Sequence, residues 1–128
     1  MKNYYVPNVP QLICGSSAER EEFLNIKYEE LTKQADENDV LLCDAQALFN
    51  EFLNALSNAT VREWRDGLLS KKYILIDGFH WFETKNIILD ELMYIFRHAN
   101  ATIILGTSKP SGEYDFGEDM NRFISIGV

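Results

Sequence analysis

The sequence predicts a three-layer α/β domain with a five-stranded, mostly parallel sheet. Short apolar runs alternate with amphipathic segments along the chain, and this alternation is typical of parallel strands joined by right-handed helical crossovers. The run Ile74-Leu75-Ile76 has no polar alternation, as expected of a strand that is covered on both faces. A chain of 128 residues that is 46% hydrophobic can bury one core. Residues 1–128 are therefore expected to form a single domain.

The first third of the chain predicts two strands and one long helix. Residues 1–10 hold two of the three prolines and are expected to be an extended lead-in. Residues 11–14 and 40–43 are short apolar runs and predict buried strands. Between them, Ser16 and Glu19 have the spacing of a capping box. Apolar positions then recur at helical spacing over about five turns: Leu24, Tyr28, Leu31 and Ala35.

The middle of the chain predicts two helices before the central strand. Asp44 can cap the first of them, which Asn58 and Ala59 end. Thr60 and Glu63 form a second capping box for a short helix. The expected inward positions of the two helices are Leu48, Phe49, Phe52 and Leu56, and then Val61, Trp64 and Leu68.

The last third predicts a helix and two more strands. A helix should begin at Thr84, and residues 102–106 form an apolar run. Residues 111–117 are expected to be an acidic loop, and 123–126 an edge strand, the fifth of the sheet. The predicted inward side chains of the helix are Ile88, Leu92, Ile95, Phe96 and Ala99.

Composition limits the function classes. The formal net charge is −8, from 20 acidic and 12 basic residues, and no basic block is present, so an extended contact with a phosphate backbone is disfavoured. Cys14 and Cys43 lack metal-ligand spacing and are expected to be small buried side chains in a reducing compartment. His80 and His98 have no second ligand nearby in sequence, so no metal site is predicted. With no signal peptide and no membrane-spanning run, the chain is expected to be soluble and cytoplasmic.

Polar residues follow three of the expected strands, at Gly15-Ser16-Ser17, Asp77-Gly78 and Gly106-Thr107-Ser108. Ligands of parallel sheets bind at the carboxyl ends of the strands. In a nucleotide-binding sheet these loops would supply a phosphate cradle, a metal-organising acid and a polar sensor. Asp77 could equally cap the helix that follows.

Three blocks of the sequence carry a family resemblance: NEFLNALSNATVREWR (50–65), ILID (74–77) and LGTSKP (105–110). They resemble the ATPase domain of the bacterial replication initiator DnaA, in order and in approximate spacing, over about residues 40–126. The resemblance implies an AAA+, P-loop NTPase-like core. It gives Asp77 the first acidic position of Walker B and places Ser108 in the sensor 1 segment. It makes Arg122 the arginine finger before the last core strand.

The departures from the family pattern concern catalysis. A phosphate-binding loop needs glycines, a lysine and a Ser or Thr, but the first strand leads into Gly15-Ser16-Ser17 and then Glu19, Glu21 and Glu22. Arg20 is a weak substitute for the lysine among these acids. The second Walker B acid is replaced by Gly78, so productive ATP hydrolysis is not expected. No cofactor is expected, and ATP or ADP with Mg²⁺ would bind only if the atypical loop holds phosphate.

Other parts of the family pattern are reduced. By the resemblance, the lid and the origin-reading domain of the family are not expected in this chain, and the paired basic residues after Walker B are reduced to Lys85. A partner or single-stranded DNA surface could still form. Its candidate residues are Arg62, Arg65, Trp81, Phe82 and Lys85. A core position is favoured for Trp64, Trp81 and Phe82, and Trp81 and Phe82 are the more readily exposed of the three. Arg122 could pair with the acidic tail or face a neighbouring subunit.

The favoured function is a non-catalytic DnaA-like protein that acts by protein contact in replication initiation or its regulation. Its partner would be the initiator, a helicase-loading protein or a second copy, without DNA binding of its own and without a membrane. The first alternative is a nucleotide-binding member of the family with an unusual phosphate loop. The second is a single-stranded DNA-binding module.

Overall fold

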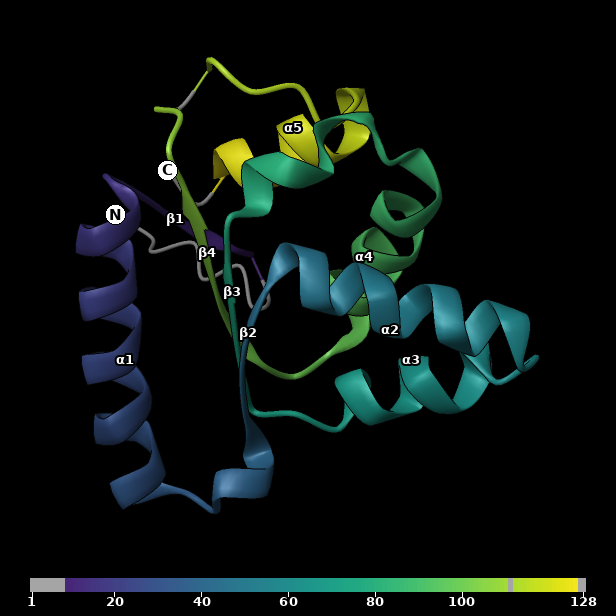
Figure 1. Ribbon diagram of the computed structural model, residues 1–128, viewed down its shortest axis with the longest axis horizontal. Coiled ribbons are helices and arrows are strands. Elements are labelled where there is room, and N and C mark those ends of the chain that lie inside the picture. Colours follow the sequence, from purple (N-terminus) through teal and green to yellow (C-terminus); the bar gives the residue numbers. More distant parts are fainter. Residues whose placement is uncertain (1–8, 111, 127–128) are drawn as a thin grey trace, which may run out of the picture.

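A computed structural model describes the chain except residues 1–8, 111 and 127–128. Within the described residues the sheet has four strands, all parallel, in the order β1-β4-β3-β2 (Figure 1). The strands are β1 (Gln11–Cys14), β2 (Val40–Asp44), β3 (Tyr73–Asp77) and β4 (Thr102–Thr107). Because all four are parallel, their carboxyl ends meet at one edge of the sheet.

Helices cover both faces of the sheet, which confirms the predicted three layers. Among the described residues, one face is covered by α1 (Ser17–Gln34) alone (Figure 1). The other face carries α2 (Ala45–Ser57), α3 (Val61–Leu69), α4 (Asn86–His98) and α5 (Glu118–Ile126). Two short 3₁₀ segments, η1 (Glu37–Asp39) and η2 (Phe79–Thr84), precede β2 and α4.

The core lies on both sides of the sheet because neighbouring strand residues point to opposite faces. On the α1 side, Leu75 and Ile104 pack with Leu24 and Leu31. The larger core lies on the opposite side of the sheet, where the alternate strand residues pack with α2, α4 and α5. These strand residues are Ile74, Ile76, Ile103 and Leu105. Ile74, Leu75 and Ile76 are each at most 1% exposed, so the prediction of a strand buried on both faces is confirmed.

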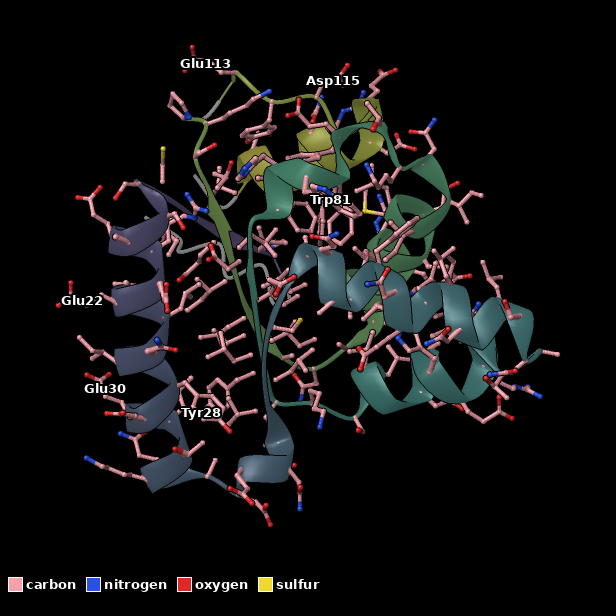
Figure 2. All side chains as sticks on the ribbon, viewed as in Figure 1. Glu22, Tyr28, Glu30, Trp81, Glu113 and Asp115 are labelled. Atoms are coloured by element: carbon pink, nitrogen blue, oxygen red, sulfur yellow. The ribbon has the colours of Figure 1, made fainter. Side chains whose placement is uncertain are left out.

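Two predicted helix caps are confirmed. Ser16 Oγ accepts a hydrogen bond from the Glu19 amide while Glu19 Oε1 accepts one from the Ser16 amide, a complete capping box. Asp44 Oδ1 accepts from the Ala47 amide at the start of α2. Tyr28 of α1 points to the sheet, whereas Glu22 and Glu30 point away from it (Figure 2).

The predicted fifth strand is wrong, because residues 118–126 form helix α5. The Asn121 amide donates to the Gly117 carbonyl oxygen at 2.9 Å, which starts the helix. Met120 and Ile124, four residues apart, are buried in the core shared with α4. Four apolar-rich residues are too few to separate alternation from helical spacing, and the decisive residue, Met120, lies before the run.

Other local predictions also need correction. Thr60 makes no side-chain cap. The chain turns at Ala59, whose φ is 55°, and the Thr60 amide donates to the Ala55 carbonyl oxygen. Helix α4 begins at Asn86, since the predicted start at Thr84 belongs to η2. Cys14 is exposed because β1 is an edge strand.

The two ends of the described chain are only partly as predicted. Most of the expected lead-in, residues 1–8, lies outside the described residues, as does Ser111. The rest of the 111–117 loop is irregular, but Tyr114 and Phe116 in it are buried against the core.

Leu56, predicted to face inward on α2, is exposed, and Ala55 is buried instead. No helix in the described part is long and apolar enough to cross a bilayer.

Candidate functional site

The strand ends singled out by the sequence meet at the carboxyl edge of the sheet. The Gly15 amide donates to the Thr107 carbonyl oxygen at 3.2 Å, which joins the loops after β1 and β4. Asp44 and Asp77 lie opposite each other in the β2 and β3 register. A hollow of about 300 Å³ opens at this edge, lined by Asp44, Asp77, Arg20, His80 and Trp81 among others. This edge is the candidate site.

Arg20 of α1 holds Asp77 directly. Arg20 Nε donates to Asp77 Oδ1 at 2.7 Å, and Arg20 Nη1 donates to the Gly15 carbonyl oxygen at 2.8 Å. The Arg20 side chain is 8% exposed and that of Asp77 is 23% exposed. Asp77 Oδ1 also accepts from the Gly78 amide at 2.9 Å. Asp77 therefore caps no regular helix, and its charge is balanced within the protein.

Gly106 provides the room for this pair. A Cβ atom at Gly106 would lie 2.6 Å from Asp77 Oδ1 and 3.4 Å from Arg20 Cδ. Residue 106 lies on the same face of β4 as Ile104, which packs under α1. The Arg20 side chain therefore extends from α1 to β3 over the backbone of Gly106, which has no side chain.

Gly106→Ala is expected to lower the free energy of unfolding by about 2 kcal/mol, because the methyl group displaces Asp77 from Arg20. Urea denaturation measures this change. Gly67→Ala is the matched control: a Cβ there meets nothing within 4 Å, and in the exposed helix α3 it should stabilise by about 0.5–1 kcal/mol. Equal stability changes in the two variants would contradict the packing described for Gly106.

The start of α1 does not fit a triphosphate. A phosphate cradle offers several free backbone amides, but the amides of Gly15, Ser16 and Glu19 already donate to groups within the protein. Hydrogen bonds from the amide and hydroxyl of Ser16 lower the pKa of Glu19, which therefore stays charged near neutral pH. Ser17 is the first residue of the helix and is exposed.

His80 lies beside the segment that the resemblance assigns to sensor 1. The Ser108 amide donates to His80 Nδ1 at 3.2 Å, and Thr107 Oγ1 is 3.4 Å from the same nitrogen. Burial and the nearby Arg20 charge lower the pKa of His80, so its imidazole is neutral at physiological pH. Ser108 itself is exposed. The Ser108 loop is thus held by a histidine that accepts a hydrogen bond.

A second ion pair fixes the loop after β4. Lys109 Nζ donates to Glu83 Oε1 at 2.6 Å, and the Asp115 amide donates to Glu83 Oε2 at 3.0 Å. The hydrogen bond from Lys109 lowers the pKa of Glu83. Glu83 therefore connects η2 to the 112–117 loop.

The remaining predicted site residues are not brought together. Arg122, predicted to precede a strand, lies on α5 and is exposed, with Nη2 2.8 Å from Glu118 Oε1. Arg62 is exposed on α3, and Arg65 makes a bidentate pair with Glu91.

The residues predicted on η2 divide between surface and core. Phe82 is 0% exposed, so of the two alternatives it is a core residue and not part of a partner or single-stranded DNA surface. Its ring contacts Phe79 and Trp81. Trp81 is half-buried, and Lys85 Nζ lies 4.0 Å from its ring centroid. Helix α2 contacts both α3 and η2 and separates them (Figure 1), so no continuous basic and aromatic platform forms among these residues.

Two features of the site were not predicted: the partner of Arg20 and the role of His80. A signal for the first was present in the sequence. Arg20 lies four residues before Leu24 and eight before Tyr28, on the apolar stripe of α1, and a buried guanidinium requires a partner. No comparable signal exists for His80, because its contact with Ser108 joins residues 28 positions apart.

Comparisons with known proteins find a fold but no sequence relative. No protein-family model matches the chain, and no curated protein matches it. AMPPCP-bound DnaA from Aquifex aeolicus is similar with a TM-score of 0.79 and 22% identity, covering 88% of this chain and 37% of that one. DnaA bound to AMPPCP and single-stranded DNA gives a TM-score of 0.80 and 22% identity, covering 94% and 38%.

An isolated domain gives the same result. Domain III of the replication initiation protein DnaA from Thermotoga maritima is similar with a TM-score of 0.82 and 14% identity, covering 93% of this chain and 52% of that one. The chain spans about half or less of the length of these three structures. At these identities the comparison establishes the architecture alone. The chain shares the fold of DnaA domain III, with a four-stranded parallel sheet in the order β1-β4-β3-β2 among the described residues.

Proposed function

We propose that this chain is a non-catalytic protein with the DnaA-like AAA+ fold, which acts by protein contact in replication initiation or its regulation. The observation that carries the proposal is the Arg20 to Asp77 pair, at 2.7 Å. By the resemblance Asp77 has the Walker B position, where a carboxylate would organise Mg²⁺. Here that carboxylate is neutralised by a guanidinium from α1.

The neighbouring groups support the same conclusion. The Ser16 and Glu19 capping box uses the helix start that would otherwise attract an anion. Gly78 follows Asp77, so no second acid is present there to orient an attacking water. A fold retained without these parts is suited to contact with another protein. The replication context comes from the similar structures, which are DnaA proteins.

The proposed partner is the DnaA-type initiator of the source organism, and the contact is tested by size-exclusion chromatography with light scattering. Arg122 is the candidate contact, since it is exposed on α5. Arg122→Ala is expected to weaken the complex about tenfold or more. It should change the free energy of unfolding by less than about 0.5 kcal/mol, because the pair with Glu118 is an exposed i,i+4 pair.

Lys33→Ala is the matched control, since it removes one exposed cation from α1, on the opposite face of the sheet. It should leave the complex unchanged. If Arg122→Ala binds the initiator as well as the unmodified chain does, Arg122 is not part of the contact. If no complex forms with the unmodified chain, the initiator is not its partner.

A further inference from the structure

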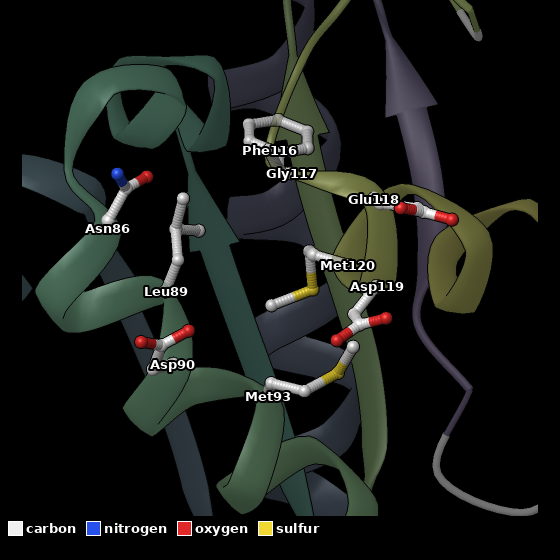
Figure 3. A pocket seen from close by; sticks show the side chains of 9 residues that line it. All are labelled: Asn86, Leu89, Asp90, Met93, Phe116, Gly117, Glu118, Asp119 and Met120. Atoms are coloured by element: carbon white, nitrogen blue, oxygen red, sulfur yellow. The ribbon is translucent and has the colours of Figure 1, made fainter.

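A groove separates α4 from α5, and none of its lining residues lines the hollow at the carboxyl edge of the sheet. Its volume is about 450 Å³. Leu89, Phe116 and Met120 line it and are each at most 4% exposed. Met93 of α4 and Met120 of α5 project into the space between the helices (Figure 3). The floor of the groove therefore contains apolar side chains, among them two flexible thioethers, which adapt to the shape of a ligand. Polar groups make up the larger part of its exposed lining.

The rims of the groove are acidic. Asp90 lies on the α4 side and Asp119 on the α5 side (Figure 3). Among the described residues neither carboxylate has an ion-pair or hydrogen-bond partner, whereas the neighbouring Glu118 pairs with Arg122. None of the residues that line the groove is a lysine or an arginine.

We propose that this groove binds a basic amphipathic segment of a partner protein. Apolar side chains of the segment would contact Leu89, Met93 and Met120, and a lysine or arginine would extend its aliphatic stem along the methionines. Its cationic group would lie between Asp90 and Asp119. This inference rests on the proposed function, since it specifies the chemistry of the contacted protein.

Charge favours a basic segment over a second copy of the chain or a nucleic acid. The chain carries a formal charge of −8, so a second copy would bring further negative charge to an acidic rim. Nucleic acid would be repelled in the same way. A cationic segment with an apolar face complements both the rim and the floor.

Methionine-methyl NMR provides a direct test, because Met93 and Met120 are two of only three methionines in the sequence. The probe is a 14-residue helical peptide of leucine, alanine and arginine, with its leucines on one face. A peptide with glutamate in place of arginine is its control. Resonances are assigned with Met93→Leu and Met120→Leu. We expect saturable shifts of both methyl groups with the arginine peptide and none with the glutamate peptide.

Matched variants separate the groove from general charge attraction. Asp90→Asn with Asp119→Asn should weaken binding of the arginine peptide about fivefold or more. Glu22→Gln with Glu30→Gln makes the same change in net charge on the outer face of α1 (Figure 2) and should weaken it less than about twofold.

Equal weakening in the two double variants, or absence of shifts at Met93 and Met120, would overturn the inference. Shifts that depend on the concentration of the protein alone would assign the groove to a second copy and also overturn it. The peptide test uses no initiator. It therefore fails or succeeds independently of the initiator-binding experiment.

Discussion

Arg20→Ala is expected to lower the free energy of unfolding by about 3 kcal/mol. The substitution leaves Asp77 without its cationic partner, beneath α1 and next to the Gly106 backbone. It also removes the hydrogen bond to the Gly15 carbonyl oxygen, which lies 2.8 Å from Arg20 Nη1. Urea denaturation followed by circular dichroism measures the change.

The control for Arg20 is Arg122, which also pairs with a carboxylate but at an exposed position. Its replacement by alanine should cost less than about 0.5 kcal/mol. A double variant, Arg20→Met with Asp77→Asn, should recover part of the loss because it removes both charges. If Arg20→Ala costs no more than Arg122→Ala, the described pair does not stabilise the fold.

Phe79→Ala is expected to lower the free energy of unfolding by about 3–5 kcal/mol. Phe79 is 0% exposed, and its ring centroid lies 4.9 Å from Phe116 and 5.2 Å from Phe82. It also lies 6.1 Å from the ring of Phe96 in α4. The substitution opens a cavity where η2, α4 and the 112–117 loop meet. Thermal and urea denaturation both measure the loss.

Phe23 on α1 is the matched control for Phe79. Its side chain is 47% exposed, so Phe23→Ala should change stability by less than about 1 kcal/mol. A loss below about 1 kcal/mol in Phe79→Ala would show that this aromatic cluster is not packed as described.

The fold could largely be predicted because its strongest signals are local. The buried strand 74–76 and the apolar stripe of α1 are repeated patterns, and Ser16 with Glu19 fixes the start of that helix. The resemblance to DnaA added the order in which the blocks of the ATPase domain follow one another along the chain. Helix α5 was missed because its inner face depends on Met120 packing on α4, a contact between segments distant in sequence.

The candidate site could be located from the sequence but its internal contacts could not. Asp77 was predicted at the carboxyl end of the central strand, which the structure confirms. The partner of Asp77 lies 57 residues earlier, and no local pattern gives the direction of a long arginine side chain. The sequence favours a core position for Phe82 but does not predict η2, the segment that places it there. A 3₁₀ segment turns Phe79 and Phe82 inward together, three residues apart.

We infer that the carboxyl edge of the sheet holds no nucleotide, since Arg20 binds Asp77 and the amides of Gly15, Ser16 and Glu19 donate to groups within the protein. The most direct test is calorimetric titration of the purified chain with ATP and with ADP in the presence of Mg²⁺. We expect no saturable heat up to millimolar ligand. Saturable binding at micromolar affinity would contradict the claim, because it would require Asp77 or the Gly15 to Ser17 loop to leave its internal partners for the ligand.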